Sequence, residues 1–408
     1  MAQKRNIEGQ RLHHFELSDK NRTVRWVLII ILLVIGAVSI IWALTNALNT
    51  PSGWQSIQAS SGGLSCSHEF ALQYDLGAGE KSATQERKEL SSLYTQLTQK
   101  AWLLFYWEAV ESDTVGLSQI NSHPNAELQV DEGLYKALEQ VTKDGNRSIY
   151  LGPVYAAYDN LFQSEDDTEA NLCDPTGEPD TKAYVQTLAS YTMDPQHVEL
   201  ELREENKVFL KVGSDYQKFL QDNGVERILD FGWLRNAFVI DYMADALKSA
   251  GFENGYIFSV DGHIRNLDKR NQQFTMNIVM DGKVAAIMDY AAPMSIVSLR
   301  SYPTYEELQD RFYTFADGRT VSAMVDPADG QSRCATSDLI AYDADMGCAR
   351  LAMMLAPAYI ADTLPEDNLT ALTQQGIYTV WKTENTVCYT QEGAKLTVNI
   401  SDLTAVKK

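Results

Sequence analysis

The 408-residue sequence contains only 5 cysteines and 11 prolines, and its basic residues are outnumbered, with 34 Lys and Arg against 55 Asp and Glu. This composition excludes a disulfide-dense, collagenous or disordered chain. The formal net charge of −21 argues against a nucleic-acid-binding protein, whose surface carries a clustered basic face. Hydrophobic residues make up 45%, so the chain can bury a large core, in one large domain or in two or three smaller ones.

The familiar short motifs of catalysis and metal binding are also missing. The sequence has no phosphate-binding loop, no nucleophile elbow, no metalloprotease helix and no C-x-x-C or Cys/His zinc pattern. The cysteines are odd in number and all follow residue 65, so we expect mostly buried free thiols, with one disulfide pair left open. They are Cys66, Cys173, Cys334, Cys348 and Cys388.

Only one long apolar run is present. Trp26–Leu44 carries no charge, and continuing it to Leu48 gives about 30 Å of helix, enough to cross the hydrocarbon core of a bilayer. A buried core helix rarely runs this long without a polar face, and the apolar region of a cleaved signal peptide usually has about 7–15 residues. We therefore predict an uncleaved transmembrane helix over residues 26–48.

The charges on either side of this run predict its orientation. Residues 1–25 hold six basic and three acidic residues, a net charge of +3, which leaves −24 on the rest. Because basic flanks stay on the cytoplasmic side, we predict a cytoplasmic tail over 1–25 and a single-pass protein of the cell membrane. Residues 49–65, rich in Ser, Gly and Pro, are predicted as a linker, and residues 66–408 as the extracytoplasmic domain.

Residue patterning within this domain indicates a mixed α+β fold. Apolar residues at helical spacing predict helices over residues 86–104, 134–141, 230–249 and 344–355. Alternation and turn signals predict a hairpin over residues 198–212, a strand over 256–260 and a hairpin over 277–288 around Asp281-Gly282. The acidic stretch 160–182 is rich in turn residues and is predicted to be a surface insertion.

Several local patterns, taken in order, carry a family resemblance. They are VGLSQINSHPNAELQVDEGLYKAL at 115–138, Gly152-Pro153, LDFGWLRNAFVID at 229–241, IFSVDGHI at 257–264 and VDPADG at 325–330, followed by a helix. The ordered set, over about residues 70–370, resembles the FAD:protein FMN transferases, the ApbE-type flavin transferases. The resemblance implies an ApbE-like mixed α/β ectodomain.

The resemblance also implies cofactors, a partner and site residues. The family moves FMN from FAD onto a Thr or Ser hydroxyl of a partner flavoprotein with the help of Mg²⁺, so FAD, magnesium and a flavoprotein acceptor are expected. No catalytic residue is assigned. The positions that match the cofactor-binding motifs are Asn121, Asp230, Gly232, Asp241, Gly262, Asp326 and Gly330, and those that match the metal-binding helix are Cys348 and Ala352.

The motifs depart from the family pattern where chemistry depends on them. Trp233 stands at a Gly position where backbone must approach a phosphate, Asn236 replaces a Lys, and Ala323 replaces a His. Asp261 and His263, in the pattern IFSVDGHI at 257–264, replace a Gly and an Asp of the family. These changes remove a cation beside an anionic ligand and add bulk beside it.

The metal position is altered as well. Cys348 replaces an Asp, and a neutral thiol is a poor ligand for a hard cation. Asp329, Asp343 and Asp345 are left as other sources of a metal carboxylate. Two functions therefore stay open: an active flavin transferase, and a non-catalytic membrane-anchored scaffold that binds flavin or a partner. Asp and Gly residues of this kind are also ordinary cap and turn residues, so an unrelated α+β adhesion or sensor domain, with accidental motif matches, is a third interpretation.

Overall fold

The computed structural model describes residues 50–60, 63–109, 113–280, 282–304, 306–383, 385–390, 394–398 and 403–408, with Leu32, Ile35, Gly36 and Ser39. The chain divides into two units, Met1–Pro51 and Ser52–Lys408. Apart from those four positions, the predicted tail and transmembrane helix lie outside the described residues. Among the residues that are described, no helix is long and apolar enough to cross a membrane. The membrane span therefore stays a prediction.

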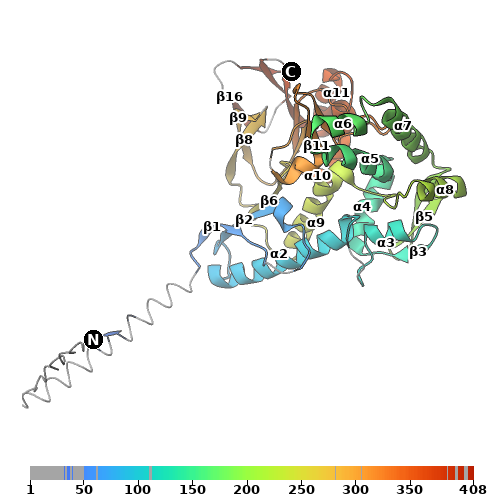
Figure 1. Ribbon diagram of the computed structural model, residues 1–408. Coiled ribbons are helices and arrows are strands. Elements are labelled where there is room, and N and C mark those ends of the chain that lie inside the picture. The colour runs from blue at the N-terminus through green and yellow to red at the C-terminus, as the bar shows by residue number, and fades with distance from the viewer. Residues whose placement is uncertain are drawn as a thin grey trace, which may run out of the picture. The chain divides into compact units, whose positions relative to one another are not determined.

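A large sheet forms the centre of the unit Ser52–Lys408 (Figure 1). Over the described residues it has nine strands in the order β1-β2-β6-β7-β10-β13-β14-β15-β17. Neighbouring strands are antiparallel, except that β15 and β17 run parallel. The strands are β1 (Gly53–Ile57), β2 (Phe70–Leu76), β6 (Gly255–Ser259), β7 (Ile264–Asn266), β10 (Met294–Arg300), β13 (Asp338–Asp343), β14 (Tyr378–Thr383), β15 (Thr386–Tyr389) and β17 (Thr404–Lys407).

Three helices cover one face of this sheet. They are α2 (Ala83–Phe105), α9 (Arg235–Ser249) and α10 (Cys348–Tyr359), which contact one another and strands β2, β6, β10 and β13. Helix α2 begins at Ser82, whose hydroxyl accepts the N–H of Gln85, and its apolar residues recur every three or four positions toward the sheet. Each fully buried Leu of this stripe contributes roughly 1.5–3 kcal/mol to folding.

The other face of the sheet carries a smaller sheet in the order β16-β9-β8. Its strands are β8 (Gln273–Met280), β9 (Lys283–Ala291) and β16 (Ala394–Val398). Ile278 and Met288 of this small sheet join a second hydrophobic cluster with Ile296, Ile340 and Tyr342 of the main sheet. The domain therefore has three layers: helices, main sheet and small sheet.

A mainly helical region completes the domain, on the side away from β8 and β9 (Figure 1). Its helices are α3 (Leu117–Ser122), α4 (Glu132–Lys143), α5 (Gly152–Phe162), α6 (Asp167–Cys173), α7 (Pro179–Met193) and α8 (Ser214–Asp222). A sheet in the order β3-β5-β4 belongs to it, with β3 (Glu127–Gln129), β4 (Val198–Arg203) and β5 (Lys207–Val212). Elsewhere lie the hairpin β11 (Phe312–Thr314) with β12 (Thr320–Ser322) and helix α11 (Glu366–Ala371).

Most predicted elements are present. Residues 86–104 lie in α2, 134–141 in α4 and 198–212 in β4 and β5. The β4–β5 turn is made by Glu205 and Asn206, which both have positive φ, at 59° and 56°. The last predicted helix begins later than expected, at Cys348.

One prediction was wrong and another was only partly right. The linker predicted over residues 49–65 contains β1, which pairs with β2 and buries Ile57, so the domain begins at Ser52 rather than near Cys66. The predicted surface insertion 160–182 does lie mostly at the surface, but it is helical rather than turn-rich: it holds the end of α5, all of α6 and the start of α7, and its Asp174 is buried against Arg319. All five cysteines are described and all are free, so the open disulfide pair is absent.

Candidate functional site

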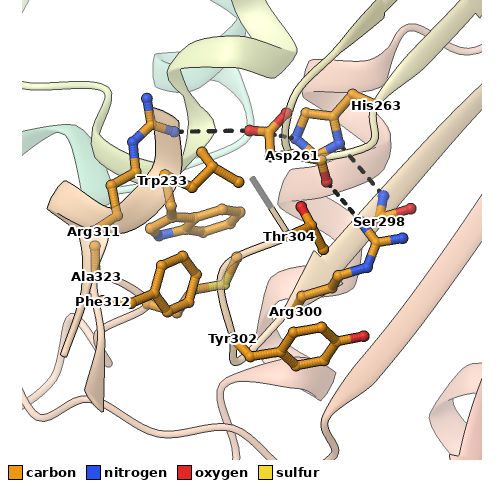
Figure 2. Close-up of a pocket in the computed structure, with 12 residues that line it drawn as sticks. Trp233, Asp261, His263, Ser298, Arg300, Tyr302, Thr304, Arg311, Phe312 and Ala323 are labelled. Carbon is orange, nitrogen blue, oxygen red and sulfur yellow. Dashed lines mark hydrogen bonds and ion pairs between the residues drawn. The ribbon is translucent and has the colours of Figure 1, made fainter. Parts of the chain in front are cut away.

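A small pocket lies where the turn between β6 and β7 faces the end of β10 (Figure 2). Trp233, in the short helical turn Gly232–Leu234 before α9, contributes its indole. Figure 2 shows this indole between Arg311 on one side and Arg300 on the other. The free volume is about 40 Å³, room for no more than a few water molecules. Pockets for ligands of drug size measure about 300–1,000 Å³, so FAD does not fit here.

Behind this pocket, a buried carboxylate forms ion pairs with two arginines. Glu69, only 3% exposed, accepts from Arg311 Nη2 at 2.7 Å and from Tyr106 Oη at 2.7 Å, and Arg235 Nη2 lies 3.2 Å from both of its oxygens. The Arg235 guanidinium also stacks 4.0 Å from the centre of the Tyr106 ring. Burial alone would raise the pKa of Glu69, but Arg235 and Arg311, helped by Tyr106, hold that pKa well below its usual range. Glu69 is therefore an anion bound by the chain's own cations.

The polar wall of the pocket is also internally paired. Arg300 Nη1 donates to the carbonyl of Asp261 at 2.9 Å, and Arg300 Nε lies 3.3 Å from Asp338 Oδ1. His263 is buried; its Nδ1 accepts the backbone N–H of Ser298 at 3.4 Å, and its Nε2 lies 3.6 Å from Asp261 Oδ2. Burial lowers the pKa of His263, so the ring is neutral at pH 7 with its proton on Nε2, toward Asp261.

Two of the predicted cofactor residues hold the backbone before α9. The side-chain amide of Asn121 clamps Leu229, donating to its carbonyl at 2.9 Å and accepting its N–H at 2.7 Å. Asp230 is buried, pairs with Arg227 and accepts the N–H of Gly232 at 2.7 Å. The structure brings Asn121, Asp230 and Gly232 together, but their polar atoms bind the chain itself.

The two motif glycines beside the pocket are needed for close packing. Gly232 has φ of +53°, and a Cβ there would lie 2.4 Å from the Tyr155 ring. Gly262 has φ of +91°, and a Cβ there would lie 2.5 Å from Arg300 Nη1. Glycine therefore lets Tyr155 and Arg300 approach the backbone.

Asp326 and Gly330 close a turn of their own. The N–H of Gly330 donates to the carbonyl of Asp326 at 2.7 Å. The Asp326 carboxylate accepts the N–H of Ala328 at 2.9 Å and pairs with Arg333 Nη1 at 2.5 Å, while Asp329 pairs with Arg333 Nη2 at 2.5 Å. One arginine thus pairs with Asp326, a predicted cofactor-binding residue, and with Asp329, one of the carboxylates considered for metal binding.

An open groove of ligand size lies next to this turn. It measures about 540 Å³ and is lined by Asp326, Arg350 and several apolar side chains, among them Met353 and Pro357. Its volume falls in the range of small-molecule sites. The groove is separate from the Trp233 pocket, with which it shares no lining residue.

Asp241 caps the helix that carries the predicted metal position. Its Oδ1 accepts the N–H of Cys348 at 2.9 Å, its Oδ2 accepts the N–H of Ala349 at 2.8 Å, and Arg265 Nε lies 3.3 Å away. A carboxylate at a helix N-terminus satisfies free N–H groups and matches the helix dipole. Burial raises the pKa of Asp241 in spite of these partners. The N-terminus of α10 is therefore closed by a group of the protein.

The predicted metal positions offer no ligand for magnesium. The Cys348 thiol is buried and donates toward the carbonyls of Ile264 at 3.3 Å and Ile296 at 3.7 Å. Burial raises the pKa of Cys348 well above its usual value, so it is a neutral thiol at pH 7. Ala352, one turn later, is buried and has only a methyl group. Hard cations bind oxygen, and Mg²⁺ does not fit these two positions.

The alternative carboxylates do not rebuild a metal site. Asp343 accepts the N–H groups of Asp345 at 2.8 Å and Met346 at 2.6 Å, and so shapes the turn before α10. In the part of the chain that is described, no group of three or more His, Cys, Asp or Glu side chains is arranged to hold a metal ion.

Solved structures share this architecture, although no family model and no curated protein sequence matches the chain. The ApbE protein of Thermotoga maritima superposes with a TM-score of 0.54 at 11% identity, covering 80% of this chain and 93% of that one. The flavin transferase ApbE of Vibrio cholerae gives a TM-score of 0.52 at 15% identity, covering 86% of this chain and 99% of that one. This chain has the ApbE fold. The fold expected from the ordered motifs is confirmed.

Within this ApbE-like domain, the ion-pair network of Glu69, Arg235 and Arg311 was missed by sequence reasoning. Arg235 comes directly before Asn236, the residue that replaces the family's Lys, so a cation persists one position earlier in the turn. Arg235 was therefore the one residue of the network that the sequence could have indicated. Glu69 and Arg311 lie outside every matched motif, and nothing in their local sequence indicates their pairing.

Proposed function

We propose that this chain is a membrane-anchored binding protein that keeps the ApbE fold without transferring FMN. The carrying observation is the Cys348 thiol, which stands at the position that the resemblance gives to a metal-binding Asp. It is buried, neutral and hydrogen-bonded toward two backbone carbonyls. Restoring a metal there would require both a new ligand and the opening of a packed helix start.

The other requirements of transfer point the same way. Phosphoryl chemistry on a pyrophosphate needs cations free to stabilise its charge and a group that activates the acceptor hydroxyl. Arg235 and Arg311 are bound to Glu69, and Asp241 is committed to capping α10. The indole of Trp233 fills the small pocket, and Ala323, in place of the family's His, presents a methyl group there.

The features that support binding are the groove and the predicted topology. The groove beside Asp326 has the volume of a small-molecule site, so flavin is one candidate ligand. The predicted anchor and the basic residues of 1–25 favour an extracytoplasmic domain tethered to the cell membrane. A partner flavoprotein at that membrane face, the acceptor in ApbE-type transfer, is the candidate macromolecule.

A transfer assay tests the proposal. The full chain in detergent is incubated with FAD, Mg²⁺ and an acceptor protein that carries the family's Thr motif, and flavin fluorescence is read on denatured acceptor. The Vibrio cholerae flavin transferase is the positive control. We expect no covalent flavin above the level without enzyme. Covalent flavin that disappears with Asp326→Ala would refute the proposal.

A binding titration accompanies the assay. FAD fluorescence that is quenched when the chain is added, with a dissociation constant below about 1 mM, would show that the groove binds flavin without transferring it. Trp233→Gly should leave that affinity unchanged, because Trp233 does not line the groove. Absence of FAD binding would leave the partner protein as the ligand.

A further inference from the structure

Aromatic side chains gather at the edge of the domain that follows the predicted membrane helix. Trp54 in β1 is 41% exposed, and its ring centre lies 5.7 Å from Tyr256 and 5.7 Å from Phe274. Tyr256 in turn lies 6.2 Å from Phe258. These last three rings are half-buried. We call Trp54, Tyr256, Phe258 and Phe274 the aromatic edge.

Strand register puts the aromatic edge on the face without helices. Trp54 pairs with Asp75, and Tyr256 pairs with Gln73, so Trp54 and Tyr256 point to the same side of the sheet. The alternate residues of β2, such as Leu72 and Tyr74, are buried in the core on the helical side. In the described residues β1 is the outermost strand, so Trp54 has no further strand beside it.

A single exposed Trp is common on protein surfaces, and its position in the chain distinguishes this one. The predicted membrane helix ends at Leu48, six peptide units before Trp54. Six extended units reach at most about 20 Å. Tyr and Trp are enriched where bilayer meets water, because their rings are apolar and their N–H or O–H groups polar.

We propose that the aromatic edge docks onto the headgroup layer of the bilayer and holds the domain in one orientation on the membrane. The proposal rests on the membrane anchor of the proposed function. A short tether gives an effective concentration in the millimolar range, so even weak surface binding is populated. The −24 charge that follows the tail gives no attraction to anionic headgroups, and on zwitterionic phosphatidylcholine docking through uncharged aromatic rings is insensitive to salt.

Photo-crosslinking in the full chain tests the docking. A photoreactive benzoylphenylalanine replaces Trp54, or Leu172 as the matched control, in chains reconstituted into phosphatidylcholine nanodiscs. Leu172 is an apolar side chain that is 70% exposed, and Figure 1 shows its helix α6 well away from β1. We expect at least about tenfold more lipid adduct at position 54 than at 172, unchanged between low and high salt.

A longer tether separates docking from mere proximity. Inserting about 20 Gly and Ser residues before Thr50 lowers the effective concentration roughly tenfold. A docked surface loses less than about half of its adduct, whereas a nearby but free surface loses about tenfold. Such a tenfold loss, equal yields at 54 and 172, adducts to a second protein chain, or failure of the chain to enter nanodiscs would each overturn the proposal. None of these outcomes except the last bears on the transfer assay, so the two proposals fail separately.

Discussion

Two parts of the domain that hold matched motif positions, the start of α10 and the surroundings of the Trp233 pocket, differ in how their polar groups are used. At the start of α10, Cys348 is a neutral thiol, and Asp241 binds backbone N–H groups and Arg265. Beside the Trp233 pocket, charges are abundant, but Arg235 and Arg311 are bound to Glu69. The thiol offers no ligand for a hard cation, and the arginines are paired within the protein. Counting charged residues near a motif therefore says little about ligand binding until their partners are known.

The largest expected effect comes from the surroundings of the Trp233 pocket. Glu69→Ala leaves the buried Arg235 without its paired carboxylate and Arg311 with only Asp261, 3.8 Å away, which should lower the free energy of unfolding by about 3–5 kcal/mol. The control is Glu89→Ala, which removes an exposed ion pair with Lys81 and should cost far less than the buried change. Urea unfolding followed by circular dichroism measures both. Equal losses in the two variants would show that the buried network contributes no more than a surface pair.

The start of α10 should respond less strongly. Asp241→Ala leaves the N–H groups of Cys348 and Ala349 without their acceptor and Arg265 without its anion, so we expect a loss of about 2–3 kcal/mol. Asp245→Ala on the same helix is the control, since its carboxylate is exposed and lies 3.9 Å from Arg265. A loss in Asp241→Ala no greater than in the control would mean that α10 needs no cap.

The smallest expected effect is on the pH dependence of the free energy of unfolding, where Glu69 and Asp241 should act in opposite directions. The pKa of Glu69 is lowered in the folded state, so its stabilisation is full above the unfolded pKa of about 4.3 and is lost as the pH falls further. The pKa of Asp241 is raised, so its contribution is most favourable at low pH and declines as the pH rises through the folded pKa.

The free energy of unfolding of the unchanged protein minus that of Glu69→Gln should therefore decrease as the pH falls. The same difference taken against Asp241→Asn should increase. Unfolding curves for the three proteins between pH 7 and the acid limit of folding measure these differences. Parallel slopes would contradict the contrast between the two parts.

How much the sequence could predict depended on how local the interactions are. Helix α2 and the β4–β5 hairpin were predictable because their caps, turns and apolar spacing lie within a few residues. Asp241 caps a residue 107 positions away, and Glu69 binds arginines 166 and 242 positions away. No local pattern contains such pairings. Strand β1 was missed because Gly, Gln and Ser in GWQSI resemble a linker, and only its pairing with β2 makes it a strand.

The sheet order also has a mechanical consequence. Over the described residues, β1 and β17 form opposite edges of the main sheet, about 40 Å apart at the usual spacing between strands. Tension between the N-terminal and C-terminal ends of the domain would therefore pull across the strands. Each edge strand has a single neighbour: β1, with five residues, pairs with β2, and β17, with four residues, pairs with β15, so these two strands would be the first to peel away. The two edge strands are, in these terms, the force-sensitive joints of the domain.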